Sequence, residues 1–229
     1  MVLSALAGII QQYGEKTGFK HLLGCWEETL VTDLLWIRMG DIVDPTMAIP
    51  QIPSWSWLSR VGGIGVDFWN RVHGRRLQRV VNDHIKILEV SITWTGEPMV
   101  SDLTSTNLIM EGPVRQIRLH IDPKGATFHP PYMNVGDEKP DFNKNPIPWK
   151  CAGQFDLEHE REDDLFTCIL VRSVASPEEQ ATYQLQETFL LLLPVPDSDG
   201  MTYQRFGIAM IRGSESEFGS AERKTIRLI

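Results

Sequence analysis

The sequence predicts a mostly β fold of the α+β class, in which short N-terminal helices pack on a largely antiparallel sheet of sandwich or barrel shape. Two observations predict it. Apolar residues recur every three or four positions before residue 52 and at alternate positions afterwards. The alternating segments then follow one another through turns, without the long helices that a parallel sheet needs. With 229 residues available for one core, we expect a helical segment (residues 1–51) packed on an antiparallel β domain (52–229) in one structural unit.

Two helices are expected in the N-terminal segment. The first covers residues 5–13, where Ser4 can cap the start and Gly14 can end the last turn. The second covers residues 27–38, where Glu27 favours the positive end of the helix dipole. Both segments place their apolar side chains on one face, as a helix packed on a sheet requires.

The remainder of the chain predicts short strands separated by turns. Pairs such as Gly112–Pro113 and Asp122–Pro123 are typical turn formers and mark where one strand ends and the next begins. The expected strands cover residues 54–60, 84–95, 107–111, 114–121, 165–174, 184–193, 203–211 and 225–229. From residue 164 to residue 212 this pattern predicts a meander of antiparallel hairpins.

Tryptophan is concentrated early in the chain, and Trp55 and Trp57 stand two apart in the segment Ile-Pro-Ser-Trp-Ser-Trp-Leu-Ser-Arg. Residues two apart on a strand share a face, and indole rings bury a large apolar area. We therefore expect both rings to be largely buried against residues 26–36. The alternative is an aromatic platform that binds a ligand such as a carbohydrate.

Charge and cysteine usage exclude several classes of function. The net charge of -8 disfavours a nucleic-acid groove or an anionic membrane surface, because either would need a strongly basic face. Cys25, Cys151 and Cys168 are odd in number and lack the Cys-x-x-Cys spacing. We expect free thiols in a reducing, cytoplasmic compartment, with no metal bound.

No motif in the sequence carries a recognised chemistry. Residues 62–65, Gly-Gly-Ile-Gly, lack the Lys and Ser/Thr that complete a phosphate loop and favour a hairpin turn. His159 lies among acidic residues without the spacing of a metal site. Cys25 follows His21 by four residues, a spacing that permits a dyad but favours packing. We expect no catalytic residue, no cofactor and no metal.

Four motifs in the first 60 residues carry a family resemblance. They are Leu6-Ala7-Gly8-Ile9-Ile10, His21-Leu22-Leu23-Gly24-Cys25-Trp26, Leu34-Leu35-Trp36 and Ile52-Pro53-Ser54-Trp55-Ser56-Trp57. Their order resembles the stretch downstream of the HET domain in fungal heterokaryon-incompatibility proteins. The resemblance covers residues 4–64, with looser matches at Tyr203-Gln204-Arg205-Phe206-Gly207 and Ile226-Arg227-Leu228-Ile229.

The resemblance implies structural roles for the motif residues. The positions that it assigns to the core are Gly24, Trp26, Leu35, Trp36, Pro53, Trp55 and Trp57. His21, Leu23 and Cys25 replace the Tyr, Ala and Leu usual in the family, which changes packing only. The HET domain's own motifs, Trp-Ile-Asp and Arg-Gly-Trp-Thr-x-Gln-Glu, are absent from this sequence, so its effector activity is carried over to no residue.

The function implied by the resemblance is a non-catalytic accessory or interaction domain that regulates an effector domain in self/non-self recognition. We expect a protein partner, no nucleic acid and no membrane. Residues 130–149 hold five prolines and predict a long surface loop, whose candidate contact residues are Pro130, Pro131, Tyr132 and Trp149. The alternative function is an enzyme or small-ligand binder with a pocket near the tryptophans.

Overall fold

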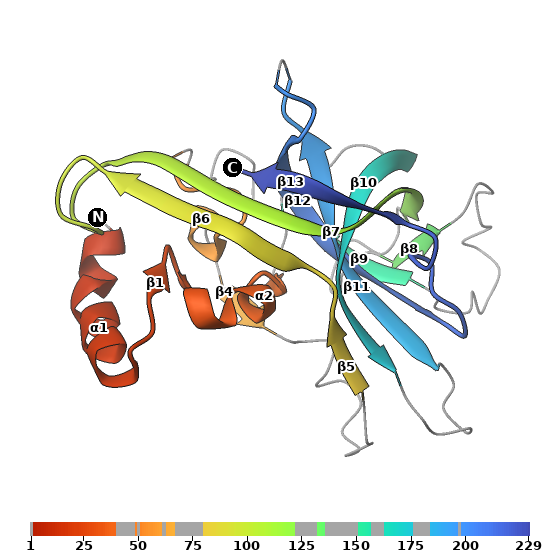
Figure 1. The fold of residues 1–229 in the computed structure, drawn as a ribbon, viewed down its shortest axis with the longest axis horizontal. Helices are drawn as coiled ribbons and strands as arrows, with labels where there is room; N and C mark the ends of the chain where they lie inside the picture. The colour runs from red at the N-terminus through yellow and green to blue at the C-terminus, as the bar shows by residue number, and fades with distance from the viewer. Residues whose placement is uncertain are drawn as a thin grey trace.

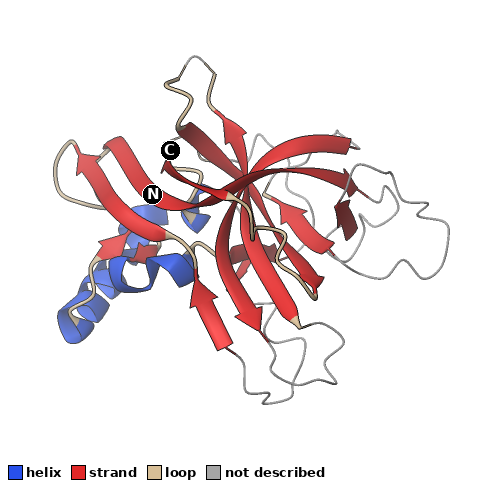
Figure 2. Cartoon of the chain, turned by 45° about the vertical axis from the view of Figure 1, so that its right-hand side comes forward, coloured by secondary structure: helices blue, strands red, loops and turns tan. Residues whose placement is uncertain are grey.

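The computed structural model describes residues 2–39, 49, 51–60, 63–66, 80–121, 132–135, 151–156, 163–175, 184–196 and 198–229. Strands make up most of this part of the chain, and the helices gather on one side of them (Figure 2). The predicted fold class, a mostly antiparallel α+β protein, is confirmed.

The elements run in the following order along the chain. They are α1 (Val2–Thr17), β1 (His21–Leu22), β2 (Cys25–Trp26), η1 (Glu27–Thr29), α2 (Leu30–Asp33), β3 (Trp36–Met39), η3 (Trp57–Ser59), β4 (Gly63–Val66), β5 (Val80–Asp83), β6 (Lys86–Trp94), β7 (Leu103–Ile121), β8 (Tyr132–Val135), β9 (Cys151–Phe155), β10 (Asp163–Ala175), β11 (Leu185–Pro194), β12 (Thr202–Gly213) and β13 (Glu222–Leu228).

Six strands close into a ring, which we call the strand ring. Going round it, β7 pairs with β8, then β9, β12, β11 and β10 follow, and β10 pairs with β7 again. Every pairing in this circuit is antiparallel. Closure gives each member two neighbours, which leaves no open edge along the paired residues. The architecture is therefore barrel-like, one of the two shapes expected.

Strand β7 also belongs to a second layer. Its first half pairs with β6 and β13, and its second half pairs with β10 and β8. The β6–β7 hairpin extends away from the ring and over the N-terminal helices (Figure 1). Strand β13 joins β12 by a short parallel pairing, and β5 pairs with the end of β10. The N-terminal segment is thus covered by strands that are continuous with the ring.

The turn expected at Gly112–Pro113 is absent, because both residues lie inside β7. Gly112 serves close packing instead: a Cβ there would stand 2.8 Å from Cγ2 of Ile85 and 3.1 Å from Cδ1 of Ile169. Pro113 lies opposite Arg223 of β13 within the ladder. Gly112 and Pro113 therefore do not end a strand here. The missing side chain of Gly112 lets β7 pass between Ile85 and Ile169.

The inner core fills the strand ring. Phe155 on β9 and Phe166 on β10 belong to strands that are not neighbours, yet their ring centroids lie 5.6 Å apart. Phe206 on β12 stacks on Phe166 at 5.8 Å. The buried members of this cluster are Ile117, Leu119, Cys151, Phe155, Phe166, Cys168, Leu170, Phe189, Leu191, Ala209, Ile211 and Phe218.

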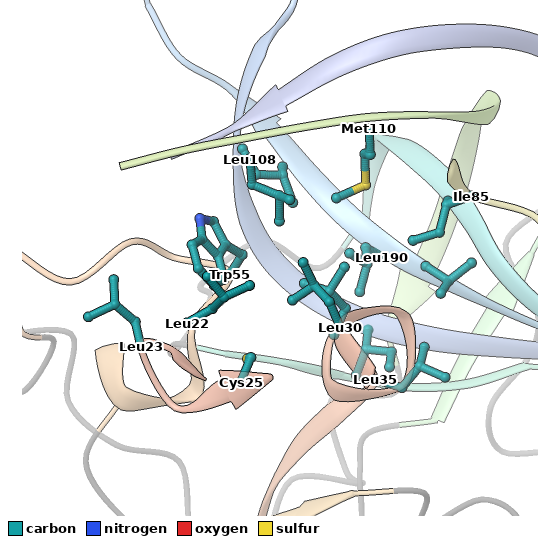
Figure 3. Close-up of a cluster of buried hydrophobic side chains, with 14 of the residues drawn as sticks. Leu22, Leu23, Cys25, Leu30, Leu35, Trp55, Ile85, Leu108, Met110 and Leu190 are labelled. Atoms are coloured by element: carbon teal, nitrogen blue, oxygen red, sulfur yellow. The ribbon is translucent and has the colours of Figure 1, made fainter. Parts of the chain in front are cut away.

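The outer core lies between the ring and the N-terminal segment. Successive residues of one strand divide between the two cores: Cys168 belongs to the inner core and Ile169 to the outer. This division follows from the alternation of side chains along a strand. Leu30 of α2, Trp55 and Leu108 of β7 meet in the outer core (Figure 3). Strands β10 and β11 are therefore buried on both faces, which explains their long apolar runs.

Two local predictions in the N-terminal segment are wrong. The second helix, expected over residues 27–38, is reduced to η1 and α2, and Trp36 then begins β3, which pairs with β4. The strand expected over residues 54–60 is a turn followed by η3. The hairpin β1–β2 and the short strands β8 and β9 were not predicted. These elements are two to five residues long, too short for a period to be recognised.

Candidate functional site

The tryptophan-rich segment owes its compact shape to serine. The Ser56 hydroxyl accepts a hydrogen bond from the Leu58 backbone N–H at 3.1 Å, which caps the start of η3. The Ser59 hydroxyl donates to the Ser56 carbonyl at 2.7 Å. Side chains that satisfy their own backbone favour such turns over a strand ladder. The alternating Trp-Ser pattern therefore forms a 3₁₀ turn instead of the expected strand.

The turn between β1 and β2 receives this segment. Ser56 donates its hydroxyl proton to the Leu23 carbonyl, and the indole N–H of Trp57 donates to the Gly24 carbonyl. Gly24 has a φ of 92°, and a Cβ there would lie 2.7 Å from Nε1 of Trp57. Its backbone N–H donates to Nε2 of His21 at 2.8 Å. Only glycine meets both the conformation and the close approach.

Trp36 and Trp55 are completely buried. Nε1 of Trp36 donates to the Trp55 carbonyl at 2.9 Å. Trp57 is half-buried, and Nε1 of Trp55 has no hydrogen-bond partner among the described residues. The contact expected between residues 55–57 and residues 26–36 is present, but the two indoles do not share a strand face, because no strand forms there.

A buried arginine, Arg205, joins this segment to the strand ring. It lies on β12 with 1% of its surface exposed. Its Nε donates to Oδ2 of Asp156 at 2.9 Å. Its Nη1 donates to the Leu34 carbonyl and its Nη2 to the Trp36 carbonyl, both at 2.7 Å. The guanidinium also stacks on the Trp36 ring, 3.6 Å from its centroid. We call Leu23, Gly24, Trp36, Ser56, Trp57, Asp156 and Arg205 the junction.

The charges of the junction are balanced at its centre. Burial lowers the pKa of the Arg205 guanidinium, and the carboxylate of Asp156 opposes that shift. Asp156 is itself only 2% exposed, so the pair is a desolvated, bidentate ion pair. Among the described residues, the hydrogen-bond partners of Arg205 are the Asp156 carboxylate and two backbone carbonyls, and these bonds hold separate chain segments together.

Sequence reasoning did not identify Arg205 or Asp156 as functional residues. Arg205 lies in the loose motif Tyr203–Gly207, which assigns it no role, and Asp156 follows the short strand β9, which the sequence does not predict. One signal is present in the sequence: strand β12 carries only two charged residues, Arg205 and Arg212, and Arg205 stands before its long apolar run. A charged residue on a strand that is buried on both faces needs a partner, although the sequence does not say which.

The remaining positions predicted as core differ in exposure. Leu35 and Pro53 are buried. Trp26 is half-buried at the surface, where its ring centroid lies 4.8 Å from that of Tyr13 and 5.3 Å from that of His21. The backbone N–H of Trp26 donates to Asp33 at 2.8 Å. Trp26 therefore holds α1 and the β1–β2 hairpin together rather than entering the outer core.

The three cysteines are buried free thiols. Burial, together with nearby Asp33, raises the pKa of Cys25 to about 12, and burial likewise raises the pKa of Cys151 and Cys168. A thiolate is the reactive form, so these positions are unsuited to nucleophilic chemistry. Nε2 of His21 accepts a hydrogen bond from the Gly24 backbone N–H, so it is not free to act as a base for Cys25. Among the described residues no group of three potential ligands could hold a metal ion.

One serine–histidine pair resembles the nucleophile and base of a catalytic triad. Nε2 of His84 lies 2.7 Å from Oγ of Ser173. Ser173 is only 5% exposed, and no carboxylate in the described ranges hydrogen-bonds to Nδ1 of His84. A nucleophile needs access to substrate and an oriented base. The pair instead links β10 to the residue that follows β5.

Several predicted positions lie outside the described residues. These are Gly62, Pro130, Pro131, Trp149 and His159. Within the expected 130–149 loop, residues Tyr132–Val135 form β8 of the strand ring, so that part of the loop prediction is wrong. None of the helices in the described ranges has the length and hydrophobicity to cross a membrane.

Comparison with protein-family models, with curated proteins and with solved structures finds no match for this chain. The geometry of the junction and the order of the sequence motifs are therefore the basis for assigning a function.

Proposed function

We propose that this chain is a non-catalytic accessory domain of the fungal heterokaryon-incompatibility type, which binds and regulates an effector domain in self/non-self recognition. One observation carries the proposal: residues from three of the four resembling motifs, and the loose match at Arg205, meet in the junction. Positions 23–24, 34–36 and 55–57 are far apart in sequence, and their contact gives the motif order a physical reason.

The chemistry of the junction supports a scaffold. The Arg205 guanidinium bonds to the Asp156 carboxylate, and the Ser56 hydroxyl donates to a backbone carbonyl. The indole N–H groups of Trp36 and Trp57 also donate to backbone carbonyls. Groups that bond to each other hold a surface in one shape but are not free to bind substrate. A rigid β domain with such a junction suits protein recognition, in which partners change little on binding.

The test is binding to a purified HET domain from a fungal heterokaryon-incompatibility protein, measured by isothermal titration calorimetry. We expect saturable binding by the wild-type chain and weaker binding by Arg205→Met, because loss of the junction releases residues 20–60 from the ring. Phe189→Ala is the control, since it weakens the inner core but leaves the junction intact. Absence of binding by the folded wild-type chain would contradict the proposal.

A second candidate, a small-ligand binder, is favoured by one atom. Nε1 of Trp55 is a buried donor without a partner among the described residues, and such donors cost stability unless a partner is supplied. A carbohydrate hydroxyl could accept this bond only after the turn around residues 51–60 opens, because Trp55 is completely buried. Proton–nitrogen NMR of the indole N–H groups during titration with mono- and disaccharides tests it. A shift confined to the Trp55 signal would support ligand binding, and unchanged signals would exclude these sugars.

A further inference from the structure

A second arginine, Arg60, stands beside the junction. It follows η3, and its guanidinium is half-buried. Its Nη1 donates to the Ser59 carbonyl at 3.2 Å. Its Nε is fully buried and has no hydrogen-bond partner among the described residues. Within the described part of the chain, Arg60 takes part in no ion pair.

The buried carboxylate nearby is committed to the other arginine. Oδ2 of Asp156 accepts from Nε of Arg205 at 2.9 Å, and Oδ1 accepts from Nη2 of Arg205 at 3.3 Å. Asp156 therefore influences Arg60 through its field alone, which raises the pKa of Arg60 against the larger lowering effect of burial. Arg60, Arg205 and Asp156 together hold two positive charges and one negative charge, so this group of three side chains carries one excess positive charge.

A partly buried cation with unused N–H donors is unfavourable unless an anion pairs with it. Guanidinium presents its donors in a planar fork that matches carboxylate and phosphate oxygens. We propose that Arg60 is the centre of an oxyanion-binding site that takes a phosphate or a carboxylate. This inference is independent of the proposed accessory function, because the excess charge exists whichever partner the domain binds.

Thermal unfolding measured in inorganic phosphate, in sodium acetate and in sodium chloride, at constant ionic strength and pH 7, tests the site. We expect phosphate or acetate at about ten times its dissociation constant to raise the Tm of the wild-type chain by about 3–6 °C over chloride. A rise with phosphate alone identifies a phosphate site. A rise with acetate alone identifies a carboxylate site of the kind an acidic side chain of a partner would fill.

Three variants make the test specific. Arg60→Gln should lose the anion-dependent rise, and its Tm in chloride should equal or exceed that of the wild type because an unpaired charge has been removed. Arg60→Lys should retain only part of the rise, because it lacks the fork. Arg118→Gln, which removes an exposed arginine from β7, should keep the whole rise. The proposal is overturned if neither anion raises the wild-type Tm, or if Arg60→Gln shows the same rise.

Discussion

The two cores of this protein are built differently, although the same strands supply both. The inner core is filled by side chains such as Phe155, Phe166 and Phe189, packed across the strand ring. The outer core is also apolar, but it is bordered by the junction. There the arginine of a buried ion pair, the Ser56 hydroxyl and the indole N–H groups of Trp36 and Trp57 donate to backbone carbonyls.

This difference suggests that one part of the molecule supplies folding stability and another fixes the position of the N-terminal segment. Apolar packing is non-directional and tolerates repacking, so it holds strands together without fixing one orientation. Hydrogen bonds from Arg205 to the carbonyls of Leu34 and Trp36 allow only one position of the N-terminal segment. We infer that the ring provides most of the folding free energy and that the junction sets how residues 20–60 lie on it.

Breaking the ion pair of the junction should have the largest effect. Arg205→Met leaves the carboxylate of Asp156 buried without a partner, which should cost about 3–5 kcal/mol of unfolding free energy. Urea denaturation followed by tryptophan fluorescence measures this loss. The double variant Arg205→Met with Asp156→Asn should recover part of it, because no charge is then left buried. A single-variant loss below about 1 kcal/mol would contradict the assigned role of the pair.

The inner core should respond to loss of volume alone. Phe189→Ala removes a completely buried ring and should cost about 3–5 kcal/mol through lost burial and the cavity that remains. Unlike the loss in Arg205→Met, which leaves a carboxylate buried without a partner, this loss should be the same from pH 5 to pH 8. Urea denaturation at these two pH values makes the comparison. A strong pH dependence of the loss in Phe189→Ala would mean that the two cores are not independent.

A smaller change isolates one hydrogen bond of the junction. Trp57→Phe keeps an aromatic ring but removes the indole N–H that donates to the Gly24 carbonyl. The expected loss is about 1 kcal/mol, the usual net value of one such bond. Trp94→Phe on β6 is the control, since Trp94 is also half-buried. Equal losses in the two variants would show that the ring, not the hydrogen bond, matters at Trp57.

The junction should also weaken in acid. Burial lowers the pKa of His21 to about 4 from its ordinary 6.5, and its neutral Nε2 accepts the Gly24 N–H. Because the pKa is lower in the folded state, this stabilising contribution is complete above pH 6.5 and is lost as the pH falls towards 4. Thermal unfolding between pH 7 and pH 4 should show a fall in Tm that is reduced in His21→Gln. The same pH dependence in both proteins would exclude His21 as its source.

The parts of the fold that could be predicted are those with long periodic patterns. Strands β10, β11 and β12 combine apolar residues with β propensity and lie within a few residues of their predicted bounds. The segment 54–60 also alternates, but Ser56 and Ser59 bond to local backbone and turn it into η3. Periodicity records which side chains are buried, and it does not reveal how the backbone satisfies its own polar groups.

The junction could be predicted only in part. The tryptophans and Gly24 were identified as structural positions from the motif order. Asp156 and Arg205 lie 49 positions apart, and Arg205 reaches Leu34 across 171 positions. A single sequence gives no signal for which distant residues meet, so the partner of a buried charge becomes known only when the strand order is known.

The link between Ser54 and Ile229 has a consequence for synthesis of the protein. The backbone N–H of Ser54 donates to the Ile229 carbonyl at 3.0 Å, across 175 positions of the chain. At 5–20 residues per second, about 10–35 s pass between the synthesis of these two residues. During that time the apolar residues of the N-terminal segment have no completed ring to pack against. The register of the N-terminal segment is therefore completed only after residue 229 has been made, so slower synthesis would lengthen the time for which its apolar side chains stay exposed.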